Sequence, residues 1–282
     1  MKSLKVFSPA KLNLSLFIGK KRKDGFHTIY SLMIPLKSLG DTFIFSKTDQ
    51  KKITLHADLS LPQKQNLVWK AANLFFKKTR LTPSHSIQIQ KKIPLGAGLG
   101  GGSSNAATTL LALNKLYGSP LSFQVLKKLA LQLGSDVPFF LYNKPAYVGG
   151  RGEKIKPLKL PLKEWFLVLN PGFPISTPWA YDQWDKANRA NSLTKKRGDV
   201  KNYTFFLKKG PWKNDFEKVI FTAYPQLEEA KQDLMRLGAS MAGLSGSGPS
   251  LYGIFEKKSL AQKAAKYFDK QNWLVWVTQG RS

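Results

Sequence analysis

Residues 94–107 read Pro94-Leu95-Gly96-Ala97-Gly98-Leu99-Gly100-Gly101-Gly102-Ser103-Ser104-Asn105-Ala106-Ala107, and five of them are glycine. The apolar spacing that follows, as far as Tyr117, predicts a helix. Glycine permits positive φ and lets a ligand approach the backbone closely. The N–H groups of such a loop favour an anion, and so does the positive N-terminal end of a helix. The stretch therefore predicts a phosphate cradle.

Two common phosphate-binding motifs do not fit this loop. A P-loop ends its glycine run with Gly-Lys and then Ser or Thr, but no lysine follows Gly102. The dinucleotide pattern GxGxxG matches residues 96–101, but that motif needs an acidic residue about 20 positions later. No acidic residue occurs between Asp58 and Asp136. The remaining alternative is a glycine-rich turn without a ligand, which the five glycines and the following helix disfavour.

The composition narrows the class of protein. A chain of 282 residues favours two domains over one, and its hydrophobic content of 42% supports a sizeable core. No apolar run approaches the length of a membrane span, and we expect neither a signal peptide nor a membrane partner. The absence of cysteine excludes disulfides, thiol catalysis and cysteine-ligated metals. We expect a cytoplasmic protein, as a monomer or a weak homodimer.

The chain is strongly basic, with 45 Lys and Arg against 17 Asp and Glu and a net charge of +28. Such an excess is typical of proteins that bind nucleic acid or an anionic surface. Here the lysines occur as pairs spread along the chain and do not form one arm or tail. This spread favours a generally basic surface with an anionic small-molecule substrate, and we expect no nucleic-acid partner.

Two features of the first half indicate a reaction. Alternation over residues 12–16 predicts a strand on which Lys11 and Asn13 share the face opposite the leucines, where they either approach a ligand or are simply solvated. Asp136 is the only acidic residue within residues 63–152. An isolated carboxylate near a phosphate loop indicates a catalytic residue, and a helix cap or a turn residue is the alternative.

The remaining elements follow from periodicity and capping signals. Asn66 and Ser122 are candidate N-caps, and Gly134 is a candidate C-cap. Strands are predicted at 4–18, 29–46, 53–57, 85–90, 165–169, 250–255 and 273–278, and helices at 66–78, from the glycine loop to 117, and at 122–133, 214–223, 225–237 and 259–269. The order in the second half suggests a ferredoxin-like domain.

Three further expectations concern the second half. We place the domain boundary between an ATP-binding domain of residues 1–155 and a C-terminal domain of residues 156–282. Residues 185–213 are polar and basic, and we expect a loose connection with a short helix there. Asn214 and Glu217 have the spacing of a capping box. A second glycine loop follows at 243–249.

Four stretches in order now carry a resemblance: Pro-Ala-Lys-Leu-Asn-Leu at 9–14, the first glycine loop, Gly-Ser-Asp-Val-Pro at 134–138, and Ser-Gly-Ser-Gly-Pro at 245–249. This set resembles the GHMP kinases, named for galactokinase, homoserine kinase, mevalonate kinase and phosphomevalonate kinase. The resemblance implies a two-domain α+β fold, with an N-terminal ribosomal-protein-like nucleotide-binding domain and a C-terminal ferredoxin-like domain. It also implies ATP as co-substrate.

Asp-Gly-Phe-His at 24–27 and Asn-Asp-Phe-Glu at 214–217 are similar to the family members that phosphorylate the 2-hydroxyl of cytidine diphosphate methylerythritol. Phe26 stands where those members more often have tyrosine, a change that keeps stacking and loses a hydroxyl. The residues that the resemblance implies are, for catalysis, Lys11 and Asp136; for the ATP phosphates, Pro94, Leu95, Gly96, Ala97, Gly98, Leu99, Gly100, Gly101, Gly102, Ser103 and Ser104; for the adenine, Asn66 and Lys92; for the cytosine, Phe26, His27 and Tyr181; and for the methylerythritol end, Asn13 and Thr177.

The chemistry agrees with these residues. A positioned carboxylate accepts the proton of an attacking hydroxyl, which is typically worth about 10²–10⁴ in rate, and a lysine beside it keeps it ionised. We expect Mg²⁺ with ATP, held mainly by phosphates and water, and assign no protein ligand to it. The alternatives are a GHMP kinase for homoserine or mevalonate, which have no base to stack, and a nucleic-acid-binding protein with a ribosomal-protein-like first domain.

Overall fold

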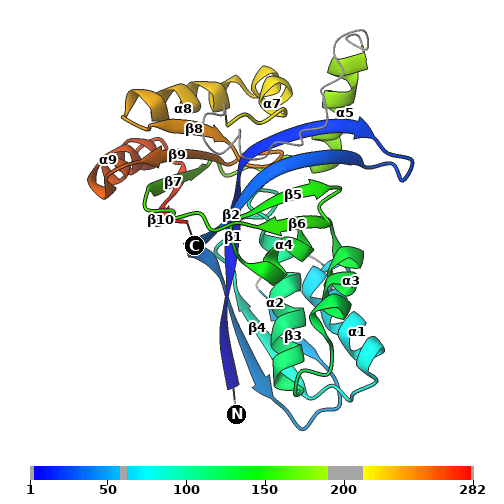
Figure 1. Ribbon diagram of the computed structural model, residues 1–282. Helices are drawn as coiled ribbons and strands as arrows, with labels where there is room; N and C mark the ends of the chain where they lie inside the picture. Colours follow the sequence, from blue (N-terminus) through cyan, green and yellow to red (C-terminus); the bar gives the residue numbers. More distant parts are fainter. Residues whose placement is uncertain (1–2, 58–61, 190–211, 281–282) are drawn as a thin grey trace.

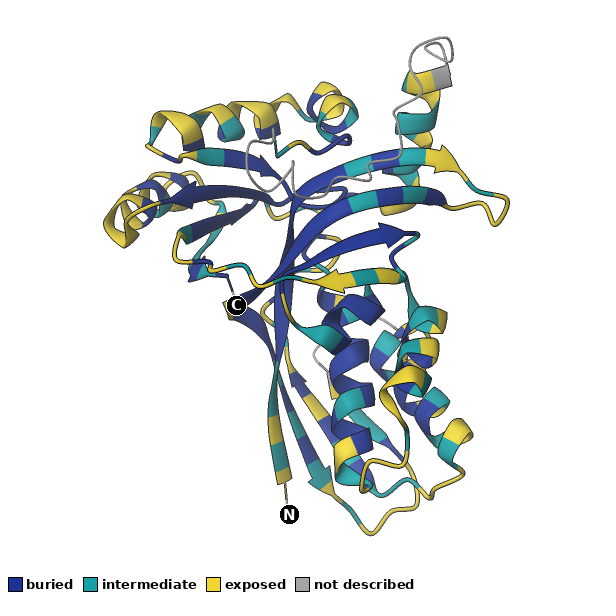
Figure 2. Ribbon diagram, in the orientation of Figure 1, coloured by how far each residue is buried: buried dark blue, intermediate teal, exposed yellow. Residues whose placement is uncertain are grey.

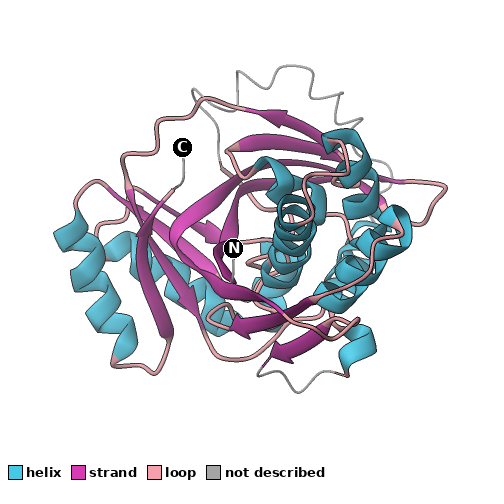
Figure 3. Ribbon diagram, turned by 90° about the horizontal axis from the view of Figure 1, so that it is seen from below, coloured by secondary structure: helices cyan, strands magenta, loops and turns pink. Residues whose placement is uncertain are grey.

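The structure, a computed structural model, describes residues 3–57, 62–189 and 212–280. Two sheets form its framework (Figure 1). The first has the strand order β3-β4-β2-β5-β6, with β1 paired to β2, and the second has the order β10-β7-β9-β8. Seen from below, strands run between two groups of helices (Figure 3). No helix among the described residues has both the length and the apolar character needed to cross a membrane.

Eleven of the described elements lie in the first half. Their bounds are β1 Ser3–Lys21, β2 His27–Lys47, β3 Thr54–Ala57, η1 Gln63–Gln65, α1 Leu67–Thr79, β4 His85–Gln90, α2 Gly101–Leu116, α3 Phe123–Leu133, α4 Val137–Tyr142, β5 Ala146–Gly150 and β6 Lys154–Pro157. The second half contributes β7 Trp165–Asn170, α5 Thr177–Arg189, α7 Glu217–Ala223, α8 Pro225–Arg236, β8 Met241–Leu244, β9 Leu251–Phe255, α9 Lys258–Asp269 and β10 Leu274–Gln279.

The hairpin of β1 and β2 is the longest feature of the fold and touches both halves. The antiparallel register shifts between Pro9 and Lys11, between Asn13 and Ser15 and between Ile18 and Lys21. The strands are buried along their middle and exposed near the hairpin tip (Figure 2). Leu12 and Leu14 are buried on one face, but Lys11 and Asn13 are buried too, at 3% and 4% exposure. The face of β1 that carries Lys11 and Asn13 is therefore buried inside the protein and is not exposed to solvent.

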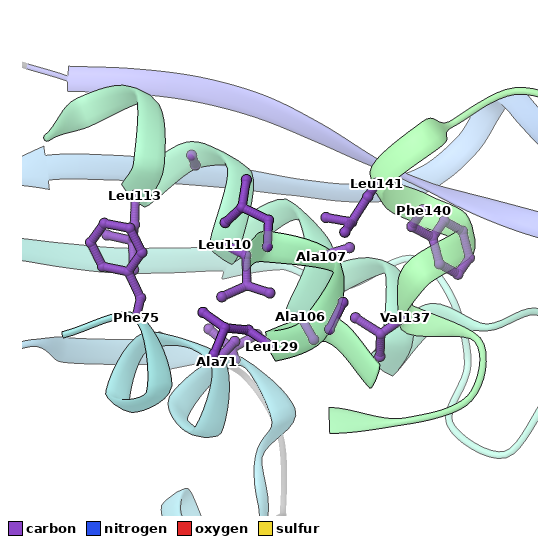
Figure 4. Close-up of a cluster of buried hydrophobic side chains, with 14 of the residues drawn as sticks. Ala71, Phe75, Ala106, Ala107, Leu110, Leu113, Leu129, Val137, Phe140 and Leu141 are labelled. Atoms are coloured by element: carbon purple, nitrogen blue, oxygen red, sulfur yellow. The ribbon is translucent and has the colours of Figure 1, made fainter. Parts of the chain in front are cut away.

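Helix α2 forms the centre of the first core. Its small and branched side chains pack against α1, α3 and α4 (Figure 4). Ala106 and Ala107 have no bulk to hold the neighbouring helices away, and the helix is buried on most of its circumference. The predicted caps are confirmed: the Asn66 side chain accepts from Val68 N at the start of α1, and Ser122 and Gly134 bound α3. This packing holds the N-terminus of α2 in place.

The second sheet confirms the ferredoxin-like expectation. Numbered along the chain, its strands lie in the order 4-1-3-2, all antiparallel, with α9 connecting the last two and packing on β7, β9 and β10. Helix α8 packs on β8 and β9. Strand β6 spans the predicted boundary at 155/156 and pairs with β5 in the first sheet. That boundary stays a prediction.

Two expectations change at the start of the C-terminal region. The capping box is wrong: α7 begins at Glu217, whose carboxylate binds Leu244 N and Lys231 instead of the backbone of Asn214. Residues 185–189, expected to be part of a loose connection, are the last turn of α5. The rest of that prediction falls largely on residues 190–211, which lie outside the described residues.

Candidate active site

A cavity of about 300 Å³ lies where the first glycine loop meets β1, α4, α5 and the second glycine loop. Of the residues expected from the sequence, it is lined by Lys11, Asn13, Pro94, Leu95, Gly96, Ala97, Gly98, Leu99, Gly100, Gly101, Gly102, Ser103, Asp136, Thr177 and Tyr181. It thus brings together the two candidate catalytic groups, the phosphate loop and part of the expected substrate pocket.

The first glycine loop uses its glycines for conformation and for space. Gly96, Gly98 and Gly100 have φ of +62°, +74° and +69°, values that L side chains rarely adopt. A Cβ at Gly98 would lie 2.2 Å from the carbonyl oxygen of Ser245, so the two glycine loops are in backbone contact. Gly100 then caps α2, whose first N–H groups have no intrahelical acceptor and lie at the cavity. Unpaired backbone N–H groups in this arrangement suit an anion.

Lys11 and Asp136 meet at the cavity. The Nζ atom of Lys11 lies 3.7 Å from Oδ2 of Asp136 and donates to the carbonyl of Gly98 at 2.8 Å. It also donates to Oδ1 of Asn13. Burial lowers the pKa of Lys11, while the charge of Asp136 and a hydrogen bond to it act in the opposite direction. The ammonium is fixed, and the Asp136 side chain, 33% exposed, remains open to a ligand.

A short hydrogen-bond chain orients Asn13. Its Nδ2 donates to Oγ of Ser31 at 2.8 Å, and Ser31 donates to the carbonyl of Ser15 at 2.6 Å. Because the NH₂ group of Asn13 is used in this way, its Oδ1 faces Lys11. This hydrogen-bond chain therefore fixes the acceptor that Asn13 presents to the lysine.

Asp136 occupies the N-cap position of the short helix α4, but its side chain makes no capping hydrogen bond. The alternative that Asp136 is a helix cap therefore holds for its backbone position, but its carboxylate does not act as a cap. Pro138 stands in the first turn, where its missing N–H costs nothing. The carboxylate is free of a cap and reaches Lys11 and the cavity.

The second glycine loop supplies residues that were not singled out from the sequence. Gly246 and Ser247 line the cavity, and Oγ of Ser247 lies 2.8 Å from Oγ1 of Thr177. Oγ of Ser245 donates to the carbonyl of Gly98 at 3.1 Å. The signal in the sequence was Ser-Gly-Ser-Gly-Pro at 245–249, which contributed to the family resemblance but was given no residue role.

The adenine side differs in detail from expectation. The side chain of Asn66 caps α1, and the backbone N–H of Lys92 donates to Asp41 at 2.7 Å; neither residue lines the cavity. Leu67 and Lys91 line it instead, and Lys91 forms an ion pair with the fully buried Asp41. Ser104, expected at the ATP phosphates, is fully buried and does not line the cavity; its Oγ lies 2.8 Å from Oγ of Ser8. A lysine pair does not reveal which member faces the ligand.

The outer part of the site is an aromatic cluster. The rings of His27 and Tyr181 stack with centroids 5.3 Å apart and an interplanar angle of 9°, and Trp184 meets His27 edge-on. Burial, with a contribution from Asp136, raises the pKa of Tyr181, so its hydroxyl stays neutral. Phe26 is 47% exposed and lies under the guanidinium of Arg151, 5.0 Å from its ring centroid. Of these rings, only Tyr181 lines the cavity.

His27 is held by two acceptors. Its Nδ1 lies 3.1 Å from the carbonyl of Gly19, and its Nε2 lies 3.0 Å from Oδ1 of Asp185. The two contacts fix the orientation of the imidazole ring between β1 and α5. Burial raises the pKa of Asp185, but Lys21 and His27 outweigh it and hold that pKa below its ordinary value. Asp185, on α5, was not foreseen from the sequence.

A glycine loop at a helix N-terminus beside a lysine and an aspartate is the arrangement expected of a small-molecule kinase, and comparison with known proteins agrees. The GHMP kinases N terminal domain matches residues 66–144, and the GHMP kinases C terminal domain matches residues 207–273. The chain belongs to the GHMP kinase family, and it is a kinase that uses ATP as co-substrate and acts on a small molecule.

Two known proteins are similar to this chain over almost their whole length. The 4-diphosphocytidyl-2-C-methyl-D-erythritol kinase of Thermodesulfovibrio yellowstonii is 40% identical, over 92% of this chain and 92% of its own length. A crystal structure of 4-(cytidine 5'-diphospho)-2C-methyl-D-erythritol kinase has a TM-score of 0.83 and 32% identity, and the match covers 99% of this chain and 100% of that one.

A crystal structure of homoserine kinase from Cytophaga hutchinsonii shares the fold. Its TM-score is 0.74 at 22% identity, and the match covers 100% of this chain and 95% of that one. The same architecture therefore serves more than one alcohol, and the substrate has to be argued from the side chains of the outer site.

Proposed function

We propose that this chain transfers the γ-phosphoryl group of ATP to the 2-hydroxyl of 4-diphosphocytidyl-2-C-methyl-D-erythritol, a step of the non-mevalonate route to isoprenoid precursors. The observation that carries the proposal is the placing of Tyr181 in the same cavity as Lys11 and Asp136. One end of the cavity offers a catalytic pair and a phosphate cradle, and the other offers an aromatic face for a base. The relatives named for this reaction support the same substrate.

The mechanism follows from the positions of three groups. The N–H groups of the first glycine loop and the start of α2 bind the phosphates of ATP. The carboxylate of Asp136 accepts the proton of the substrate hydroxyl as its oxygen attacks the γ-phosphorus. The ammonium of Lys11 stabilises charge on the transferring group and keeps Asp136 ionised. Phosphoryl transfer has a loose transition state, so positioning and charge neutralisation dominate the rate.

Mg²⁺ fits this site as a partner of the phosphates. Asp136 is the only acidic residue among the described residues that line the cavity, and no group of three or more potential ligating side chains occurs in the described chain. We propose that phosphate oxygens and water supply most of its ligands, as is usual for this ion in kinases. When bound, it neutralises charge on the phosphates.

Substrate recognition is proposed to use the aromatic cluster. The cytosine packs on Tyr181, with Phe26 approaching from the β1–β2 hairpin and His27 at the edge of the base. Because His27 already stacks on Tyr181, a base between Phe26 and Tyr181 requires that ring to move or the base to take the remaining face of Tyr181. Thr177 and Asn13 lie at the cavity, where the methylerythritol end would reach the γ-phosphate.

We further propose that the protein acts in the cytoplasm as a monomer or weak homodimer, without nucleic-acid or membrane partners, and that its ATP-binding domain ends near residue 155. The support is the lack of cysteine, the spread of the basic residues and the nature of the substrate. Sedimentation at several protein concentrations tests the oligomeric state. A constant mass above that of two chains would contradict it.

The test of the function is ADP release with ATP and Mg²⁺ and one of three alcohols: the cytidine substrate, mevalonate or homoserine. We expect turnover with the cytidine substrate alone. Turnover with another alcohol would support the kinase activity but contradict the proposed cytosine pocket. Salt-sensitive binding to RNA, with no ADP release from any alcohol, would favour the nucleic-acid alternative.

A further inference from the structure

The segment 213–217 lies between β1 and the second glycine loop, and the proposed mechanism assigns it no role. Its sequence suggested a helix cap, but the side chains reach residues that are distant in the chain. Asn214 is 3% exposed and sits at the centre of these contacts. A buried amide with partners from two other elements is a candidate for a function of its own.

The amide of Asn214 holds the second glycine loop. Its Nδ2 donates to the carbonyl oxygens of Leu244 and Gly246, each at 2.8 Å. Its Oδ1 accepts from the backbone N–H of Phe216 at 3.0 Å. Both N–H groups and the oxygen are thereby used, which fixes the orientation of the amide and the positions of both carbonyls.

Gly246 stands directly against the catalytic lysine. A Cβ built on Gly246 would lie 3.2 Å from Nζ of Lys11, 3.4 Å from Oδ1 of Asn13 and 3.1 Å from the carbonyl oxygen of Gly98. The backbone of this residue, with φ of +62°, therefore forms the wall that confines the ammonium. A displacement of the Gly246 carbonyl would change the space in which Lys11 is held.

The other side of the segment is bound to the strand that carries the lysine. The backbone N–H of Leu16 donates to the carbonyl of Lys213 at 2.9 Å, and the N–H of Asp215 donates to the carbonyl of Leu16 at 2.8 Å. The carboxylate of Asp215 accepts from Ile18 N at 2.9 Å. The segment is thus hydrogen-bonded to both β1 and the second glycine loop, and it fixes the distance between them.

We propose that Asn214 is a positioning residue for phosphoryl transfer, which sets Gly246 against Lys11 and thereby fixes the lysine relative to Asp136. The inference rests on the proposed kinase reaction and adds to it a residue that touches neither substrate nor nucleotide. Asn214 acts on the rate of the chemical step more than on the binding of ATP, because the N-terminus of α2 is held separately by the packing of that helix on α1, α3 and α4.

The variant Asn214→Asp tests this inference, because it conserves size and removes both N–H donors that the two carbonyls need. Asn170→Asp is the matched control: Asn170 is equally buried, but its Nδ2 donates to the hydroxyl of Ser250, which can reverse its role and donate to a carboxylate. For both variants we would measure the thermal midpoint, kcat, KM for ATP and KM for the cytidine substrate.

We expect Asn214→Asp to lower kcat by about 10-fold to 100-fold with KM for ATP changed by less than about threefold, as for a small misplacement of catalytic groups. Asn170→Asp should keep kcat within about threefold of the wild-type value. A carboxyl facing two carbonyls has a raised pKa, and its protonated form regains one donor. The kcat of Asn214→Asp relative to wild type should therefore rise as the pH is lowered from about 8 to about 6.

An unchanged kcat in folded Asn214→Asp would overturn the inference, and so would equal losses of kcat in both variants, which indicate a merely structural role. If Asn214→Asp does not fold, Asn214→Ser decides by the same comparison, since serine keeps one donor. Failure of the proposed function is a separate result, because the wild-type protein itself would then release no ADP with the cytidine substrate.

Discussion

The inner and outer parts of the cavity are built in different ways. The inner part uses backbone and buried networks: Lys11, at 3% exposure, is held by Gly98, Asn13 and Asp136. The outer part uses side chains at the end of a hairpin and on one helix, and Phe26 there is 47% exposed. Phosphoryl transfer needs fixed atoms, whereas recognition of a base needs a planar face. The difference implies that reaction and substrate choice are separable by mutation.

The largest expected effect is at Asp136. Asp136→Asn leaves the size of the side chain unchanged and removes the proton acceptor, so kcat should fall by about 10²–10⁴-fold. Steady-state ADP release checks this. A kcat within about threefold of wild type would show that the inner part works without this carboxylate.

The next effect is at Gly98. Gly98→Ala places a Cβ 2.2 Å from the carbonyl of Ser245 at φ of +74°, so the two glycine loops must separate. We expect KM for ATP to rise by at least about tenfold and the thermal midpoint to fall. Gly172→Ala is the control, since Gly172 has φ of +86° with nothing within 4 Å of its Cβ position. Equal effects of the two variants would assign the loss to backbone strain alone.

The third effect is a pH dependence of the inner part. Burial holds the pKa of Lys11 below the ordinary lysine value of 10.5, against the opposing charge of Asp136. As the pH rises through this lowered pKa, Lys11 loses its charge and kcat should fall about tenfold per pH unit. In Lys11→Arg the charge persists, so the alkaline fall should move to higher pH even though kcat is lower. An alkaline fall that stays at the same pH in Lys11→Arg would assign it to another group.

The smallest effects belong to the outer part. Tyr181→Ala should raise KM for the cytidine substrate by about 5-fold to 150-fold, which corresponds to about 1–3 kcal/mol for loss of a stacked base. Phe26→Ala should have the smaller effect because Phe26 is half exposed, and Tyr181→Phe should stay near wild type. None of these three variants should change kcat by more than about threefold. A fall of kcat at unchanged KM in Tyr181→Ala and Phe26→Ala would show that the outer part contributes to the chemical step and would contradict the separation.

Local signals explain which features the sequence predicted. The glycine loop, the N-caps at Asn66 and Ser122 and the alternation around Lys11 depend on neighbours within a few residues, and the structure confirms them. The ferredoxin-like strand order followed from the alternation of strands and helices. The proximity of Lys11 and Asp136 came from resemblance, because no local pattern brings positions so far apart together.

The features that could not be predicted from the sequence depend on contacts between residues that are distant in the chain. Asn214 and Glu217 have the spacing of a capping box, and Oδ1 of Asn214 does accept from Phe216 N, but the Glu217 carboxylate accepts from Leu244 N, which is distant in the chain. Lys91 and not Lys92 faces the cavity, because the buried Asp41 draws Lys91 into an ion pair. His27 stacks on Tyr181 because Asp185 holds it from α5. Each of these choices is made by tertiary contacts.

The central claim is that the inner part performs the reaction and the outer part binds the base. Calorimetric binding of the cytidine substrate to Asp136→Asn tests it most directly, because this variant is altered only in the inner part. We predict a Kd within about threefold of the wild-type Kd, together with the loss of ADP release. A Kd weakened by more than about tenfold would contradict the separation and make Asp136 part of the substrate-binding surface.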